Sequence, residues 1–211
     1  MTQIGAPRHD PIPIGDVAAP PFARLPDPAA LFGQRAERFR VLAHGHELAP
    51  YLLFLADLSA AQHAVQDGLP AVELLDPEAL ARAREFAMPP LDRSRFTSDA
   101  ACDATLDRLL ALAATCDMPV PASVALRTLR TADPATLAAM VRSVLADSIP
   151  VEAIAGHVFV AAALQVHFAR LAAQLDARRL VPVGDGACPA CGGPPVSSMV
   201  VGWPGAHGTR F

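Results

Sequence analysis

The sequence predicts an all-α protein, an irregular bundle of about seven helices, followed by a turn-rich metal-binding module. Alanine and leucine dominate a chain of 211 residues in which 52% are hydrophobic and only 5% are aromatic. This composition favours packed helices over sheets built from aromatic and β-branched residues. Helix-start signals recur along the chain, and proline or glycine follows the apolar runs. Near the end, a Cys-x-x-Cys pair among glycines and prolines is typical of a metal-binding knuckle.

The first half of the chain predicts an arm and three helices. Residues 1–26 are rich in proline and predict an extended arm. Asp27, followed by proline, starts the first helix, because aspartate caps the first N–H groups and proline fits the first helical position. Apolar residues at helical spacing predict a second helix over residues 50–66, which Gly68 ends. Asp76 with its proline starts a shorter third helix.

The second half of the helical domain, which we place at residues 27–181, predicts four more helices. Asp99, or Ser98 just before it, caps the fourth, and a short helix follows over residues 122–130. Asp133, again followed by proline, starts the sixth. The last helix, predicted over residues 151–180, is nearly continuous in apolar residues. We expect it to be the central helix, because a helix that is hydrophobic all round must be buried.

Two late cysteines carry the recognisable chemistry of this chain. Cys188 and Cys191 are separated by Pro-Ala and followed by two glycines. The spacing lets both thiolates face one metal ion, and glycine lets the backbone turn tightly so that its N–H groups face the sulfurs. A tetrahedral site needs four ligands, and no second pair precedes Phe211. We therefore interpret residues 182–211 as the start of a module that residues beyond Phe211 would complete.

Two other interpretations of Cys188 and Cys191 remain open: a redox dithiol, and a chance pair. In a redox dithiol, a helix N-terminus commonly activates the first thiolate. Thioredoxin-like sites place such a pair between a strand and a helix of a βαβ unit. Here the pair follows a helical domain and leads into Gly-Gly-Pro-Pro. A metal knuckle is therefore the favoured interpretation.

The remaining cysteines and histidines do not predict a second metal site. Cys102 and Cys116 lie on or at the end of the fourth predicted helix, roughly 20 Å apart along its axis, and are interpreted as buried small hydrophobes, with partial exposure allowed for Cys116 near the helix end. His157 and His167 are ten positions apart and do not form the i, i+4 pair of a zinc helix. His207 lies near the knuckle, but four thiolates would leave it no vacancy.

Composition argues against several classes of function. The net charge is −4, and no run of basic residues interleaves with aromatics, so we expect no nucleic-acid partner. The start of the chain lacks an apolar signal region. The most apolar stretch, residues 153–169, is shorter than the about 20 residues that a membrane span needs, so we expect no span and a cytoplasmic protein. Phosphate loops, dinucleotide fingerprints and paired acids are absent from the sequence, so we expect no enzyme.

The knuckle and three upstream segments resemble one family. The string Cys-Pro-Ala-Cys-Gly-Gly-Pro-Pro-Val-Ser-Ser-Met-Val from Cys188 resembles the start of the cysteine-rich part of the FdhE family, the formate dehydrogenase accessory (formation) proteins. Arg-Ala-Glu-Arg-Phe at residues 35–39 and the Tyr-Leu pair at residues 51–52 are similar to the first two helices of that family. Pro-Pro-Leu-Asp at residues 89–92 is similar to its connector. The likeness extends from about residue 28 to the end of the chain.

The resemblance implies a cytoplasmic maturation factor, an assembly chaperone that binds the catalytic subunit of respiratory, molybdenum-containing formate dehydrogenases. It also implies rubredoxin-like sites that hold iron in the intact protein, with Cys188 and Cys191 matching the first cysteine pair. Residues 182–211 would then be a truncated rubredoxin-like or zinc-ribbon-like module. The alternatives are a zinc-ribbon adaptor unrelated to formate metabolism and a Cys-x-x-Cys thiol oxidoreductase acting on a client. The oligomeric state does not follow from the sequence.

Overall fold

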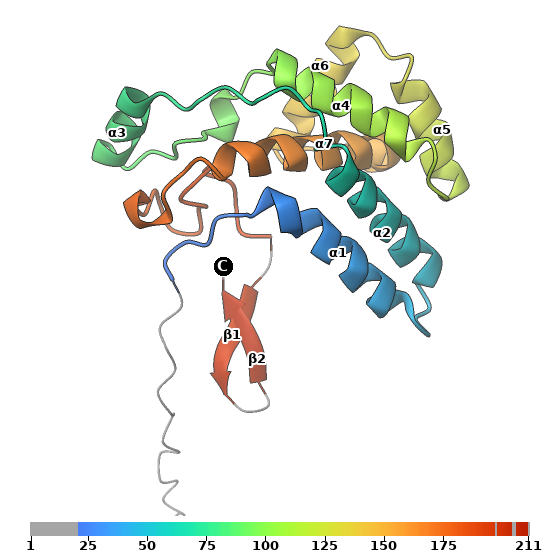
Figure 1. Ribbon diagram of the computed structural model, residues 1–211, viewed down its shortest axis with the longest axis horizontal. Coiled ribbons are helices and arrows are strands. Elements are labelled where there is room, and N and C mark those ends of the chain that lie inside the picture. Colours follow the sequence, from blue (N-terminus) through green and yellow to red (C-terminus); the bar gives the residue numbers. More distant parts are fainter. Residues whose placement is uncertain (1–20, 197, 204–205, 211) are drawn as a thin grey trace, which may run out of the picture.

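A computed structural model describes the backbone of residues 21–196, 198–203 and 206–210, and the side chains as far as Val196. Most of the predicted arm, residues 1–20, lies outside this described part. The described residues form seven α-helices, three short 3-10 helices and two strands (Figure 1). In chain order these are α1 (Pro28–Ala43), α2 (Ala49–Ala64), α3 (Pro77–Glu85), η1 (Arg93–Arg95), α4 (Ala100–Ala113), α5 (Val120–Leu129), α6 (Pro134–Leu145), η2 (Val151–Ala153), α7 (Ile154–Ala172), η3 (Ala177–Arg179), β1 (Ser198–Trp203) and β2 (Ala206–Arg210).

The structure confirms the four helix N-termini that the sequence predicted at aspartate residues. The side chains of Asp27, Asp76 and Asp133 accept backbone N–H groups at the starts of α1, α3 and α6. At α4 the cap is Asp99, whose Oδ1 accepts the N–H of Cys102 at 2.7 Å. Each bond satisfies an N–H that has no partner within the helix. The local sequence therefore fixes where these helices begin.

Helix α7 lies at the centre of the bundle, as predicted. It packs against α1, α2, α4, α5 and α6, and Figure 1 shows it running through the middle of the helical body. Phe159, Val160 and Val166 are completely buried, and the Phe159 ring meets the edge of Phe54 with ring centroids 6.1 Å apart. The segment Val151–Ala172 is long and apolar enough to span a membrane, and half of its most apolar window is buried in the fold. Here its sides are covered by the other helices, as in the core helix of a bundle.

The last helix is shorter than predicted. The expected helix over residues 151–180 begins as the 3-10 turn η2 and ends as an α-helix at Ala172. Beyond it, the Gln174 side chain bonds to the backbone of the segment before α3, accepting from Leu75 and donating to Glu73. Asp176 then caps the separate turn η3 by accepting the N–H of Arg178 at 3.0 Å. The α-helix therefore ends at Ala172, before the predicted end at residue 180. The bonds of Gln174 to a distant segment and the new cap at Asp176 follow directly after it.

The junction of α1 and α2 is more exposed than the apolar periodicity predicted. The apolar residues Leu42 and Tyr51 at this junction are 41% and 49% exposed. Figure 1 shows this junction at the end of the α1–α2 pair that points away from α7. Without a third helix beside it, an apolar face at this junction stays in contact with water.

After the helical body, β1 and β2 form an antiparallel hairpin. Ser198 pairs with Arg210 and Val200 with Gly208, and the register shifts before Trp203 pairs with Ala206. The rubredoxin-like or zinc-ribbon-like identity of residues 182–211 stays a prediction, as do the predicted boundaries at residues 26 and 181.

Candidate functional site

The structure brings Cys188 and Cys191 together in a tight turn. The N–H of Cys188 donates to the carbonyl of Gly193, and the N–H of Gly192 donates to the carbonyl of Cys188, both at 2.8 Å. Gly192 has φ of +74°, in the left-handed region that glycine adopts without steric cost. These paired bonds close the loop around the two sulfurs. The Cys-x-x-Cys-Gly-Gly spacing predicted a tight turn here, and the role of that turn as a metal knuckle stays a prediction.

The two thiols share a hydrogen bond that separates their acidities. The pKa of Cys188 is lowered to about 5, chiefly because the Cys191 thiol donates to its sulfur, with a further contribution from the N–H groups of Ala190 and Cys191. The same bond, together with burial, raises the pKa of Cys191. One thiolate therefore forms readily in the knuckle, and it is the thiolate that binds metal.

The knuckle is attached to the helical body through the connector that follows α3. The N–H of Leu91 donates to the carbonyl of Ala190 at 2.8 Å, and the N–H of Arg93 donates to that of Cys191 at 3.2 Å. A Cβ at Gly192 would lie 3.1 Å from the Pro89 side chain, and a Cβ at Gly193 would collide with Arg93. The two glycines therefore permit the close approach of the connector.

Arg93 joins the connector to the end of α6. Its Nε donates to the carbonyl of Leu145 at 2.6 Å, and its Nη2 forms an ion pair with Asp147. The Arg93 side chain is only 20% exposed, whereas that of Asp147 is 57% exposed. Through its backbone N–H and its guanidinium, Arg93 thus links the knuckle to a part of the chain about fifty residues away.

The two cysteines line the edge of an open groove of about 450 Å³, which we call the knuckle groove. Its floor is apolar and comes mainly from α1, the end of α6, and α7. Its charged residues are three arginines and one aspartate. The lining residues are Arg24, Leu25, Pro26, Leu31, Phe32, Arg35, Leu91, Arg93, Val144, Leu145, Asp147, Ala161, Leu164, Gln165, Phe168, Ala169, Ala172, Cys188, Ala190 and Cys191.

Arg35 is the charged residue of the groove that α1 supplies. Its Nη1 donates to Oε1 of Gln165 on α7 at 2.6 Å, and its guanidinium carbon lies 5.1 Å from the centre of the Phe32 ring. Gln165 is itself held by buried Gln62, whose Nε2 lies 3.2 Å from the same oxygen. Burial lowers the pKa of Arg35. Arg35 is thus partly exposed and packs on Phe32.

Among the described residues, two thiols at the knuckle could bind a metal ion, and no third ligand lies beside them. Within that part of the chain, no group of three or more His, Cys, Asp or Glu side chains converges on one point. The side chain of His207 lies outside the described part. Two converging thiols, one with a lowered pKa, fit half of a tetrahedral thiolate site for iron or zinc. Cys188 and Cys191 would hold such an ion, and two further ligands would have to complete its coordination.

The other sulfurs and His157 have structural surroundings. Cys102 is buried in the core, and burial raises its pKa to about 11. Cys116 is partly exposed, with a pKa also raised chiefly by burial. The Nδ1 atom of buried His157 is bonded to the carbonyl of Ala153 at 2.8 Å. The interpretation of these cysteines as small hydrophobes therefore agrees with buried Cys102 and with Cys116, which is partly exposed and packs against the core.

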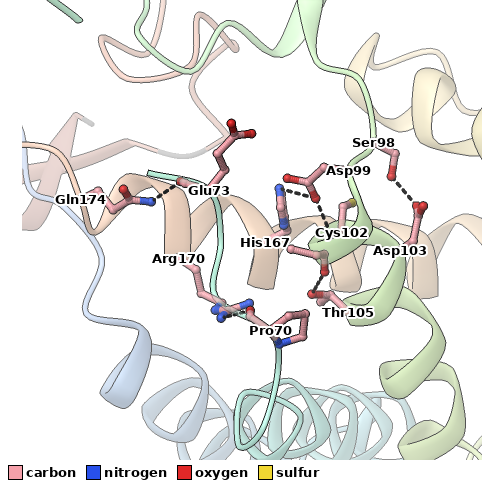
Figure 2. A network of polar contacts seen from close by, with 11 residues as sticks. Pro70, Glu73, Ser98, Asp99, Cys102, Asp103, Thr105, His167, Arg170 and Gln174 are labelled. Atoms are coloured by element: carbon pink, nitrogen blue, oxygen red, sulfur yellow. Dashed lines mark hydrogen bonds and ion pairs between the residues drawn. The ribbon is translucent and has the colours of Figure 1, made fainter. Parts of the chain in front are cut away.

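His167 on α7, which the sequence did not predict to be a metal ligand, lies in a buried polar position. His167 is fully buried, and neither ring nitrogen has a hydrogen-bond partner among the described residues. Figure 2 shows its ring turned toward Asp99, whose Oδ1 lies 3.9 Å from Nε2. Burial lowers the pKa of His167, with Asp99 and Asp103 opposing this and Arg170 adding to it. The Phe96 ring packs against the edge of the His167 ring, with centroids 5.5 Å apart. Burial among such neighbours favours the neutral form of His167.

Two family models match the chain: FdhE, N-terminal, over residues 20–185, and FdhE, central domain, over residues 187–211. The chain is 46% identical over 202 residues to a protein FdhE homolog of Rhizobium meliloti (strain 1021), covering 96% of the chain and 66% of that relative. It is 35% identical over 186 residues to a protein FdhE homolog of Pseudomonas aeruginosa, covering 86% of the chain and 58% of that relative.

A solved structure has the same fold. The crystal structure of the FdhE protein from Pseudomonas aeruginosa superposes with a TM-score of 0.72 at 34% sequence identity. The match covers 86% of this chain and 63% of that one. The chain thus spans slightly less than two thirds of the length of the relatives it matches.

Proposed function

The chain belongs to the FdhE family, and from this premise we propose that it is an accessory protein for the formation of a respiratory, molybdenum-containing formate dehydrogenase. The single observation that carries the proposal is the family match over residues 20–185 and 187–211. In this role the protein binds the catalytic subunit of the enzyme in the cytoplasm and assists its maturation without catalysing a reaction of its own.

The helical body and the knuckle have different tasks in this proposal. The bundle around α7 is a rigid support with a large buried core, and the knuckle is attached to it through Leu91 and Arg93. An iron ion held by Cys188, Cys191 and two further ligands would order the loop-rich module, which is too small for a core of its own. Zinc in the same position is the alternative metal.

Co-purification tests the proposal most simply. A tagged form of the chain, expressed in cells that respire formate, should enrich the formate dehydrogenase catalytic subunit over a tag-only control, as measured by quantitative mass spectrometry. The enrichment should persist in a Cys102→Ala variant, because that thiol is buried away from the knuckle. Equal recovery of the catalytic subunit with the tag alone would contradict the proposal.

A second candidate function is thiol exchange on the client, and the hydrogen bond between the two knuckle thiols favours it. In that function the Cys188 thiolate would attack a client disulfide, Cys191 would resolve the mixed disulfide, and the client would be left reduced and the knuckle oxidised. Cys188→Ser separates the two functions. A variant that still binds metal and client but no longer supports enzyme formation would favour thiol exchange. Loss of metal together with support would favour the metal site.

A further inference from the structure

The knuckle groove combines an apolar floor with a positive charge that the described residues do not neutralise. Arg93 is paired with Asp147, the one acidic residue of the lining. The described residues offer Arg35 no carboxylate within 4.0 Å, and its one described hydrogen bond goes to the neutral Gln165. A partly desolvated guanidinium in such a place is stabilised by an anion from outside.

The shape of the groove suits a protein segment. Its volume of about 450 Å³ is open to solvent, and residues of the knuckle and of α1 are among those that line it. Leu31 and Phe168, both partly exposed, give the floor an apolar surface that an aliphatic or aromatic side chain can cover. A planar guanidinium recognises a carboxylate through two parallel N–H···O bonds. The complementary ligand is therefore an apolar side chain with a carboxylate beside it.

We propose that the knuckle groove binds a segment of the formate dehydrogenase catalytic subunit that presents an acidic side chain next to an apolar one, with Arg35 as the ion-pair partner of the carboxylate. This inference rests on the proposed function, because it names the chemistry of the partner that the function requires. The client segment would lie against the knuckle, so metal binding by Cys188 and Cys191 and client docking would share one surface.

The test measures the affinity of the purified chain for the purified catalytic subunit from the same organism by biolayer interferometry. Arg35→Leu removes the charge but keeps apolar volume, and Arg38→Leu is the matched control, since it removes an exposed arginine from the same helix. We expect Arg35→Leu to weaken binding by about tenfold to a hundredfold, as the loss of one charged hydrogen-bonded contact does. Arg38→Leu should change it less than about twofold.

Two further variants make the result specific. Arg35→Lys should retain part of the affinity, because it keeps the charge and loses the planar fork. Raising the salt concentration should weaken binding of the parent chain more than binding of Arg35→Leu. Circular dichroism and thermal unfolding of each variant verify that the helical body remains folded.

Each alternative outcome has a distinct meaning. Equal affinities for the parent chain and Arg35→Leu, or equal losses for Arg35→Leu and Arg38→Leu, would overturn the groove proposal while leaving the proposed function in place. Leu48, which is 57% exposed at the α1–α2 junction, provides a further variant: a loss of affinity in Leu48→Ser but not in Arg35→Leu would place the docking site at that junction and overturn the groove proposal. Sedimentation velocity compares the oligomeric state of the variants with that of the parent chain. A lower sedimentation coefficient for Arg35→Leu but not for Arg38→Leu would show that the groove holds a second copy of the chain and would overturn the proposal. No binding by the parent chain would contradict the proposed function itself.

Discussion

Arg93 gives the sharpest prediction about how the knuckle is held to the helical body. Replacing it by methionine keeps most of the apolar stem but leaves the carbonyl of Leu145 without the donor that now lies at 2.6 Å. An unpaired, partly buried carbonyl costs about 1–3 kcal/mol. Loss of the half-exposed ion pair with Asp147 adds at most about 1 kcal/mol. Arg93→Met should therefore lower the free energy of unfolding by about 1–4 kcal/mol, or Tm by roughly 2–16 °C.

Asp147→Asn is the matched control for this prediction. Asp147 has φ of +51°, which asparagine also tolerates, so this variant removes the ion pair without adding backbone strain. It should cost no more than about 1 kcal/mol. Both values come from urea titrations followed by circular dichroism. If Arg93→Met cost no more than Asp147→Asn, the bond to Leu145 would contribute nothing and the attachment described here would be wrong.

Two further predictions concern buried titratable groups. Because burial lowers the pKa of His167 in the folded chain, the unfolded chain binds a proton there more readily, so stability falls as the pH drops below about 6.5. Urea midpoints at about pH 5 and about pH 7.5 should differ less in His167→Phe than in the parent, and an equal difference would contradict this. The buried Cys102 thiol, with a pKa of about 11, should resist iodoacetamide at about pH 8 while Cys116 reacts. Peptide mass spectrometry measures the labelling of each cysteine, and equal labelling of Cys102 and Cys116 in the folded chain would refute this prediction.

The parts of the fold that follow from local chemistry could be predicted from the sequence. Asp27, Asp76, Asp99 and Asp133 each cap a helix through bonds within the next few residues, so their effect is local. The central place of α7 follows from its lack of a polar face. The end of that helix could not be predicted, because it depends on bonds between Gln174 and a segment about one hundred residues away.

The same distinction applies to the site. Cys188 and Cys191 are three positions apart, so the local spacing alone predicts that the two thiols converge. Arg35 and Arg93 are placed by partners 130 and 52 residues away, which no local pattern reveals. One signal was available: two consecutive glycines after the second cysteine indicate that another segment approaches the knuckle closely. The sequence could not tell that this segment is the connector.

The most direct test of the central claim is the formate dehydrogenase activity of cells that lack the gene encoding this chain. Formate-dependent dye reduction by membranes measures it, and a molybdenum enzyme that does not use formate is the control. If the chain assists formation of the enzyme, formate-dependent activity will be lost, the control activity will be unchanged, and the restored gene will return the lost activity. Undiminished formate dehydrogenase activity in the deletion strain would contradict this claim.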